Sequence, residues 1–293
     1  MFETVAIVGV GLIGGSLGLA LRQRGLAGRV LGIPRREETI REALSVGAID
    51  EGTLDLARVS EADLVVLAPP VLTIPRLVAA MVPHLRPGTV VTDVGSTKGA
   101  LMRELSRLLP PEVDLVGGHP MAGSEQGGVL ASRANLFEGA VYVLTYAERT
   151  RPENLERLAA LVRGLGARPV ELDAELHDDA VARISHLPHV VAAALAEATG
   201  ASVLPPEMLR LLVAGGFRSS TRIASSPPEM WRDICLTNRD AILAALSDFE
   251  ASLAAFRAAI EQEDAEGLYA AFARGKAVRD DLVPPTAPGA SLP

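Results

Sequence analysis

The sequence is poor in three residue types, and each shortage excludes a class of site. It holds one cysteine in 293 residues, Cys235, so neither an intrachain disulfide nor a cysteine zinc cluster can form. Aromatic residues make up 3 %, which argues against the stacking platforms of single-strand nucleic-acid binders. Only two of the 28 basic residues are lysines, and 36 acidic residues bring the net charge to −8. This charge argues against a nucleic-acid partner.

Long uninterrupted apolar runs are also scarce. Residues 5–21 carry no charge, but glycines interrupt them, no basic flank precedes them, and the stretch is shorter than the ~20 residues of a membrane span. We therefore expect a buried strand, turn and helix here, and no membrane partner. The lone cysteine suggests a reducing, cytoplasmic location.

Over the first 172 residues, short apolar runs alternate with helical stretches. This order predicts an α/β domain with a parallel sheet and crossover helices. We expect a helix over 153–165. The expected strands are 4–8, 29–33, 62–67, 89–93, 113–116, 140–145 and 168–172.

After Asp173 the strand signals stop and Ala/Leu-rich periodic segments begin. The expected helices span 174–199, 206–215, 228–262 and 264–282. We predict a dinucleotide-binding domain over 1–172, an all-α substrate and dimerisation domain over 173–283, and a disordered tail over 284–293. The apolar helix faces are extensive for so short a segment, which predicts a homodimer.

The first expected strand runs into a Gly-x-Gly-x-x-Gly motif. Gly9 would make the tight turn, Gly11 would let backbone approach a pyrophosphate, and Gly14 would allow close helix packing. The helix that follows offers free N–H groups to phosphates. The fold class we predict is therefore a Rossmann-type parallel-sheet domain followed by the all-α domain.

The end of the second strand bears on the choice of dinucleotide. NAD sites usually place an acid there, whereas this chain has Pro34-Arg35-Arg36. Two guanidiniums suit a 2′-phosphate, so NADP is favoured over NAD, although Glu37 and Glu38 could still reach a ribose. The predicted cofactor-binding residues are Gly9, Gly11, Leu12, Ile13, Gly14, Arg35 and Arg36.

A glycine-rich loop carries the candidate base. Gly117-Gly118-His119-Pro120 follows the fifth expected strand, and an imidazole on a rigid loop suits general base catalysis. The fourth strand ends in Asp93-Val94-Gly95-Ser96-Thr97-Lys98, and both loops would share the crevice beyond the carboxyl ends of the strands. Further polar segments follow at 177–178, 185–189, 215–224 and 230–233.

Together these segments resemble the prephenate and arogenate dehydrogenases of tyrosine biosynthesis. The resemblance runs from about Thr4 to Asp280. Its marks, in the family's order, are Gly-x-Gly-x-x-Gly, Asp-x-Gly-Ser-x-Lys, Gly-Gly-His-Pro-x-Ala-Gly-Ser-Glu, Ser-His-Leu-Pro-His and Thr-Arg-Ile-Ala. It implies hydride transfer from a ring alcohol to NAD(P)+, with loss of carbon dioxide.

The resemblance also implies residue roles. His119 would accept the proton of the substrate hydroxyl, and Ser96 would hydrogen-bond His119. Arg222 would bind a substrate carboxylate and His189 would contact the side-chain end. Ser124 and Glu125 would also be substrate-binding residues, with Glu125 in the network at the pocket entrance. Many relatives carry an aspartate where this chain has Ser219, which puts the gating role of Glu125 in doubt. An unperturbed imidazole titrates near ~6.5, so activity is expected to rise through that region, modified by burial.

Alternatives remain open at this stage. Lys98 could act as the catalytic ammonium of another hydroxyacid dehydrogenase, or the chain could be a dinucleotide sensor without activity. His177, His186 and His189 could hold a metal, but no carboxylate spacing supports this, so we expect no metal. No residue decides between prephenate and arogenate.

Overall fold

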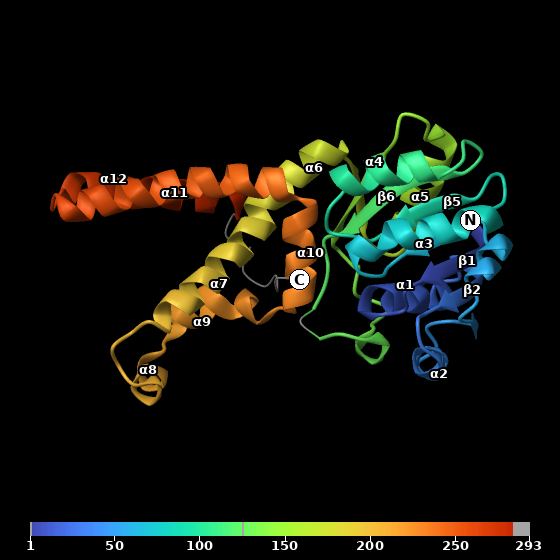
Figure 1. The fold of residues 1–293 in the computed structure, drawn as a ribbon, viewed down its shortest axis with the longest axis horizontal. Coiled ribbons are helices and arrows are strands. Elements are labelled where there is room, and N and C mark those ends of the chain that lie inside the picture. Colours follow the sequence, from blue (N-terminus) through green and yellow to red (C-terminus); the bar gives the residue numbers. More distant parts are fainter. Residues whose placement is uncertain (1, 125, 284–293) are drawn as a thin grey trace. The chain divides into compact units, whose positions relative to one another are not determined.

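The computed structural model describes residues 2–124 and 126–283. The first 172 residues contain one eight-stranded sheet with helices packed against it (Figure 1). The strand order is β3-β2-β1-β4-β5-β6-β7-β8, and every neighbouring pair is parallel except β6 and β7. The strands are β1 (Phe2–Val8), β2 (Ala27–Ile33), β3 (Glu51–Gly52), β4 (Leu64–Leu67), β5 (Val90–Asp93), β6 (Asp114–Pro120), β7 (Val141–Tyr146) and β8 (Arg168–Glu171).

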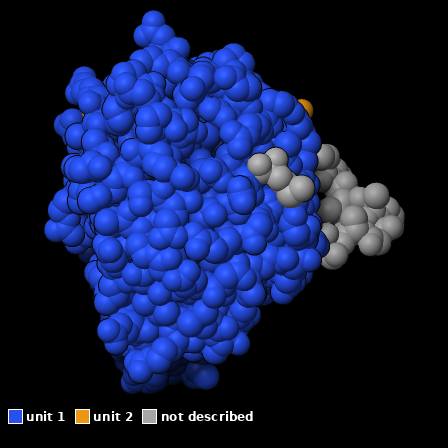
Figure 2. All heavy atoms as spheres, turned by 90° about the vertical axis from the view of Figure 1, so that its right-hand side faces the viewer, with its two compact units in different colours: residues 1–239 blue, residues 240–293 orange. Residues whose placement is uncertain are grey.

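The helices divide between two compact units, residues 1–239 and the part from residue 240 on, which Figure 2 colours separately. The helices are α1 (Leu12–Gln23), α2 (Glu37–Ser45), α3 (Ile74–Met81), α4 (Gly99–Leu108), α5 (Pro152–Gly164), α6 (Ala174–Val181), α7 (Leu187–Thr199), α8 (Pro206–Leu212), α9 (Gly215–Thr221), α10 (Pro228–Thr237), α11 (Arg239–Glu261) and α12 (Ala265–Leu282). A π-helical turn, η5 (Ala182–His186), joins α6 to α7.

Alternate residues of the strands supply two apolar cores, one on each face of the sheet. On β1, Val5 and Ile7 pack into the core that α1 and α5 cover, whereas Ala6 and Val8 face the core of α3 and α4. Strands that are buried on both faces read as continuous apolar runs, which explains the composition of β1 and β4. The sheet is therefore rigid, and its carboxyl ends can hold a site firmly.

The expected strands are all present, with shifts of a few residues at their ends. Sequence reading missed β3, since two residues carry no periodicity. The expected parallel sheet is confirmed, with one antiparallel pair that the sequence did not indicate, β7 against β6. This pairing extends β6 through Pro120, so His119 lies within a strand and not on the loop after it, as the glycines had suggested.

The expected helix 174–199 is interrupted by η5, and the expected helix 228–262 breaks at Asn238 into α10 and α11. The helix α9 was not expected, because Gly215-Gly216 begins it. The second unit contains α12 and nearly all of α11, with Phe256 and Phe272 packed edge to face.

The predicted boundary at residue 172 stays a prediction, and the predicted tail 284–293 lies outside the described residues. None of the described helices is both long enough and apolar enough to cross a membrane.

Candidate active site

The turn after β1 has the geometry of a phosphate cradle. Gly9 adopts a φ of +93°, and a Cβ there would lie 2.7 Å from the backbone carbon of Ala68. A Cβ on Gly14 would overlap the Gly9 carbonyl oxygen, so both glycines are required by packing alone. A Cβ on Gly11 would meet nothing within 4 Å. The space in front of Gly11, at the start of α1, thus fits a dinucleotide pyrophosphate.

Two exposed arginines follow β2. Arg35 lies in the turn and Arg36 precedes the first residue of α2. Neither guanidinium forms an ion pair with another described residue. Glu37 and Glu38 occupy the first turn of α2, where they face the helix dipole favourably. The two arginines are therefore available to a phosphate.

A buried ion pair shapes the loop after β5. The Lys98 ammonium bonds the Asp93 carboxylate, and neither side chain is exposed. The same carboxylate accepts hydrogen bonds from the backbone amides of Gly95 and Gly118, at 2.8 and 3.1 Å. Asp93 thus ties the β5 loop to β6 next to His119. This arrangement positions a loop; it does not present an ammonium to a substrate.

His119 lies near the end of β6, opposite Val143 of β7, and is 9 % exposed. Its Nδ1 is 2.8 Å from Nε2 of His177, and Nδ1 of His177 is 2.8 Å from Oδ1 of Asp178. Burial lowers the pKa of His119 well below 6.5, and it would be lowered further by repulsion from His177, Lys98 and His186 wherever these groups carry a proton. His119 is therefore neutral at pH 7 and able to accept a proton.

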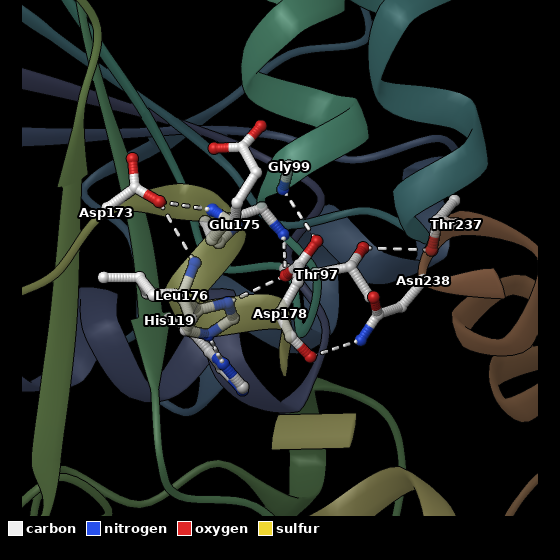
Figure 3. A network of polar contacts seen from close by, with 12 residues as sticks. Thr97, Gly99, His119, Asp173, Glu175, Leu176, Asp178, Thr237 and Asn238 are labelled. Carbon is white, nitrogen blue, oxygen red and sulfur yellow. Dashed lines mark hydrogen bonds and ion pairs between the residues drawn. The ribbon is translucent and has the colours of Figure 1, made fainter. Parts of the chain in front are cut away.

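Asp178 connects the hydrogen-bonded side chains of His119 and His177 to the start of α4 and to Asn238, which follows α10 (Figure 3). Its carboxylate accepts hydrogen bonds from the amides of Lys98 and Gly99, both at 2.7 Å, at the start of α4. Its backbone oxygen accepts a hydrogen bond from Nδ2 of Asn238, which also lies 3.1 Å from Nδ1 of His186. Burial lowers the pKa of His186 to about 4. His186, like His119, is therefore uncharged near neutral pH.

The π-helical turn and α7 carry the second part of the site. Nδ1 of His189 lies 2.8 Å from the carbonyl oxygen of Ser185, and its ring stacks on Trp231 with centroids 3.6 Å apart. Arg222 begins the short helix η6 (Arg222–Ser225), which packs against α7. Burial and the Arg222 charge lower the pKa of His189. The structure thus brings His189 and Arg222 together.

Comparisons with known proteins match both parts of the chain. The family model "Prephenate dehydrogenase, nucleotide-binding domain" matches residues 17–171, and "Prephenate dehydrogenase, dimerization domain" matches 173–274. The prephenate dehydrogenase of Bacillus subtilis (strain 168) is 40 % identical over 287 residues, which are 96 % of this chain and 76 % of that protein. The chain belongs to the prephenate dehydrogenase family.

Solved structures agree with this assignment. The A. aeolicus prephenate dehydrogenase, in complex with hydroxyphenyl propionate and NAD+, is 36 % identical with a TM-score of 0.89, over 97 % of this chain and 99 % of that one. The Synechocystis arogenate dehydrogenase is 33 % identical with a TM-score of 0.83, over 96 % of this chain and 100 % of that one. This prephenate dehydrogenase family member is an NAD(P)-dependent dehydrogenase.

The structure does not settle the roles predicted for three further residues. Ser96 follows β5 and is partly exposed, and no hydrogen bond joins it to His119 among the described residues. Ser124 is exposed and accepts a hydrogen bond from the Gln126 amide at 3.2 Å. Glu125 lies outside the described residues. The roles of these residues stay predictions.

Sequence reading missed the part that His177, Asp178 and Asn238 play around His119. His177 had been weighed only as a metal ligand with His186 and His189, yet the Nδ1 atoms of all three face protein partners. No group of three or more potential ligands that could hold a metal occurs among the described residues. The available signal was the adjacent pair His177-Asp178, four and five residues after the helix cap Asp173.

Proposed function

We propose that this protein oxidises and decarboxylates prephenate or arogenate, producing 4-hydroxyphenylpyruvate or tyrosine for tyrosine biosynthesis. The observation that carries the proposal is the neutral, buried imidazole of His119. It lies near the carboxyl end of β6 in the sheet, and its Nδ1 is engaged by His177, which leaves Nε2 for a substrate. The family membership supports the same reaction.

His119 is the base of the proposed reaction. Its Nε2 takes the proton of the ring hydroxyl while a hydride leaves the same carbon, and the C–O bond becomes a carbonyl. The ring carboxylate then leaves as carbon dioxide, and its bonding electrons move through the ring onto the carbonyl oxygen. That oxygen takes a proton back from His119 and becomes a phenol. The base is thereby regenerated, and the reaction releases no net proton.

The substrate is a diacid, and the second part of the site suits it. Arg222 binds the ring carboxylate in a charge-assisted pair, and His189 contacts the side-chain end. Both come from segments that pack together, which supports a shared ligand. Ser96 is proposed to act at the hydroxyl end next to His119, and Ser124 and Glu125 at the entrance.

A dinucleotide bound at Gly9, Gly11, Leu12, Ile13 and Gly14 would supply the hydride acceptor. The open space at Gly11 and the amides at the start of α1 hold its pyrophosphate. We propose NADP as the preferred cofactor, because the exposed guanidiniums of Arg35 and Arg36 follow β2 and form no ion pair with another described residue. We further propose that no metal takes part.

The runner-up function, a hydroxyacid dehydrogenase with Lys98 as the acid, has less support. The Lys98 ammonium is fully buried and paired with Asp93, so it is not accessible to a substrate. The sensor without activity is disfavoured by the intact His119, Ser96 and Arg222.

Two further proposals concern the setting of the enzyme. We propose a homodimer, since the matched dimerization-domain model covers helices that expose large apolar side chains such as Leu211 and Leu212. The lone cysteine supports a cytoplasmic location.

An assay of the purified protein with both substrates and both cofactors, following the reduced nicotinamide, tests the function. We expect turnover with at least one substrate and a higher kcat/KM with NADP+ than with NAD+. Folded protein that binds NADPH but turns over neither substrate would refute the reaction. A strong NAD+ preference would refute only the cofactor proposal.

A further inference from the structure

The carboxylate of Asp178 is held by three donors. Oδ1 accepts the Lys98 amide and Oδ2 the Gly99 amide, both at 2.7 Å, and Oδ1 also lies 2.8 Å from Nδ1 of His177. The two amides begin α4, whose dipole favours a negative charge at this end. An ionised carboxylate only accepts hydrogen bonds. Nδ1 of His177 must therefore carry the hydrogen of this contact.

The tautomers of the next two groups follow from this. A neutral His177 with its hydrogen on Nδ1 has a lone pair on Nε2, which is 2.8 Å from Nδ1 of His119. Nδ1 of His119 must then donate to it. Nε2 of a neutral His119 is therefore left with a lone pair, which is the tautomer that a base acting through Nε2 requires.

We propose that His177 and Asp178 are positioning residues that fix the tautomer of His119 and share the proton it takes from the substrate. This inference rests on the proposed function, in which His119 is the base. None of the motifs that carried the family resemblance contains either residue. The pair acts through His119 and does not touch the substrate.

The proton balance of the reaction gives the pair its task. When the hydroxyl O–H bond breaks, an N–H bond forms at Nε2 of His119, and the ring becomes positively charged. Its Nδ1 hydrogen is then shared with Nε2 of His177, which spreads the charge toward the Asp178 carboxylate. When the phenol oxygen takes the proton back, both rings return to their first tautomers. No oxidant or additional reactant is needed.

The surroundings explain why this support is needed. His119 is buried, and electrostatic interactions with His177, Lys98 and His186 all disfavour an imidazolium there. Asp93 offsets the Lys98 charge within its own ion pair. Asp178 is the carboxylate that reaches His119 through a hydrogen-bonded partner. Without it, a proton held in this interior would lack a compensating charge.

Two substitutions of His177 separate positioning from packing. His177→Leu keeps approximate volume but removes the acceptor, and we expect kcat to fall roughly 10²–10⁴-fold with KM nearly unchanged. His177→Gln offers an amide oxygen to Nδ1 of His119 and should recover part of that loss. His84→Gln, at an exposed histidine, is the matched control and should match the wild type. Thermal melting identifies variants that fail to fold.

Nitrogen NMR of the wild type labelled at histidine tests the same proposal without turnover. We expect His119 and His177 both to carry hydrogen on Nδ1 and none on Nε2 at pH 7, with assignments from the single variants. A hydrogen on Nε2 of His119 would overturn the proposal, as would a folded His177→Leu variant with wild-type kcat. If the wild type turned over neither substrate, the proposed function would fail while the tautomers could still be read.

Discussion

Burial decides what the histidines of the site can do. Burial disfavours the charged forms of both His119 and His186, so their neutral forms are favoured. From the residue type alone, activity was expected to rise through about pH ~6.5. The structure moves that expectation toward acid, since a base with a lowered pKa stays unprotonated further down the pH scale.

The pH dependence of kcat/KM follows from this shift. Because the pKa of His119 lies well below 6.5, the base remains neutral as the pH falls through 6.5. We expect kcat/KM to hold through pH 6.5 and to decline only at lower pH, in steady-state assays at saturating cofactor. A decline centred at or above pH 6.5 would contradict the burial argument.

At the residue scale, the sequence identified the candidate site residues that belong to motifs. It missed the residues that contact a motif residue through hydrogen bonds. His119 and Gly9 stand out because they belong to the recognisable motifs Gly-Gly-His-Pro and Gly-x-Gly-x-x-Gly. His177 and Asp178 do not stand out, since a helix of ordinary composition carries them. Their roles depend on the contact of α6 with the start of α4, which local sequence does not encode.

Among the elements, the turn from β1 to α1 contains glycines with different tasks: Gly14 is needed for packing, and Gly11 is proposed to leave space for the cofactor. Gly14→Ala would push a methyl group into the Gly9 carbonyl, and we expect it to lower the free energy of unfolding by about 1–3 kcal/mol. Gly11→Ala meets no atom within 4 Å and suits its extended backbone, so the fold should be unchanged. Its methyl group would instead enter the pyrophosphate space and weaken cofactor binding roughly tenfold, about 1.4 kcal/mol.

Denaturant unfolding and cofactor titration of these two variants measure the contrast. Equal destabilisation by both substitutions, with equal cofactor affinity, would contradict the assignment of Gly11 to the cofactor.

The turn from β2 to α2 governs the proposed cofactor preference. Replacing Arg35 and Arg36 together by glutamine removes two charge-assisted donors, each worth about 1.5–3 kcal/mol. We expect KM for NADP+ to rise at least tenfold while KM for NAD+ stays nearly constant. Arg107→Gln, at an exposed arginine on α4, serves as the control. An unchanged ratio of the two KM values would remove these arginines from the cofactor site.

Element boundaries show where sequence patterns lose their power. The continuous apolar runs of β1 and β4 predict buried strands correctly, because two covered faces require them. The extension of β6 through Pro120 depends on an antiparallel partner more than 20 residues later. The π-helical turn at 182–186 likewise contains no glycine or proline, so no residue within it indicates the change of helix type.

For the molecule as a whole, buried neutral histidines make stability depend on pH. The folded-state pKa of His186 is about 4, below its unfolded value near 6.5, so the unfolded chain binds more protons between these values. The contribution is fully present above pH 6.5 and is lost as the pH falls toward 4. It amounts to about 3 kcal/mol for this 1 % exposed side chain.

Urea unfolding at pH 7 and at pH 4 should therefore show a loss of stability in acid, and His186→Gln should reduce that loss. If His186→Gln left the pH dependence unchanged, another group would be responsible. His84→Gln, which changes an exposed histidine, should leave it as in the wild type.

The central claim is that His119 and Arg222 act on the same small diacid substrate, His119 as the base and Arg222 as the residue that binds a carboxylate. Steady-state kinetics of two variants test it most directly. His119→Asn should lower kcat roughly 10²–10⁴-fold with little change in substrate KM. Arg222→Ala should instead raise substrate KM about tenfold or more, since it leaves a carboxylate unpaired. Wild-type kcat in the His119→Asn variant, or an unchanged KM in Arg222→Ala, would contradict the account.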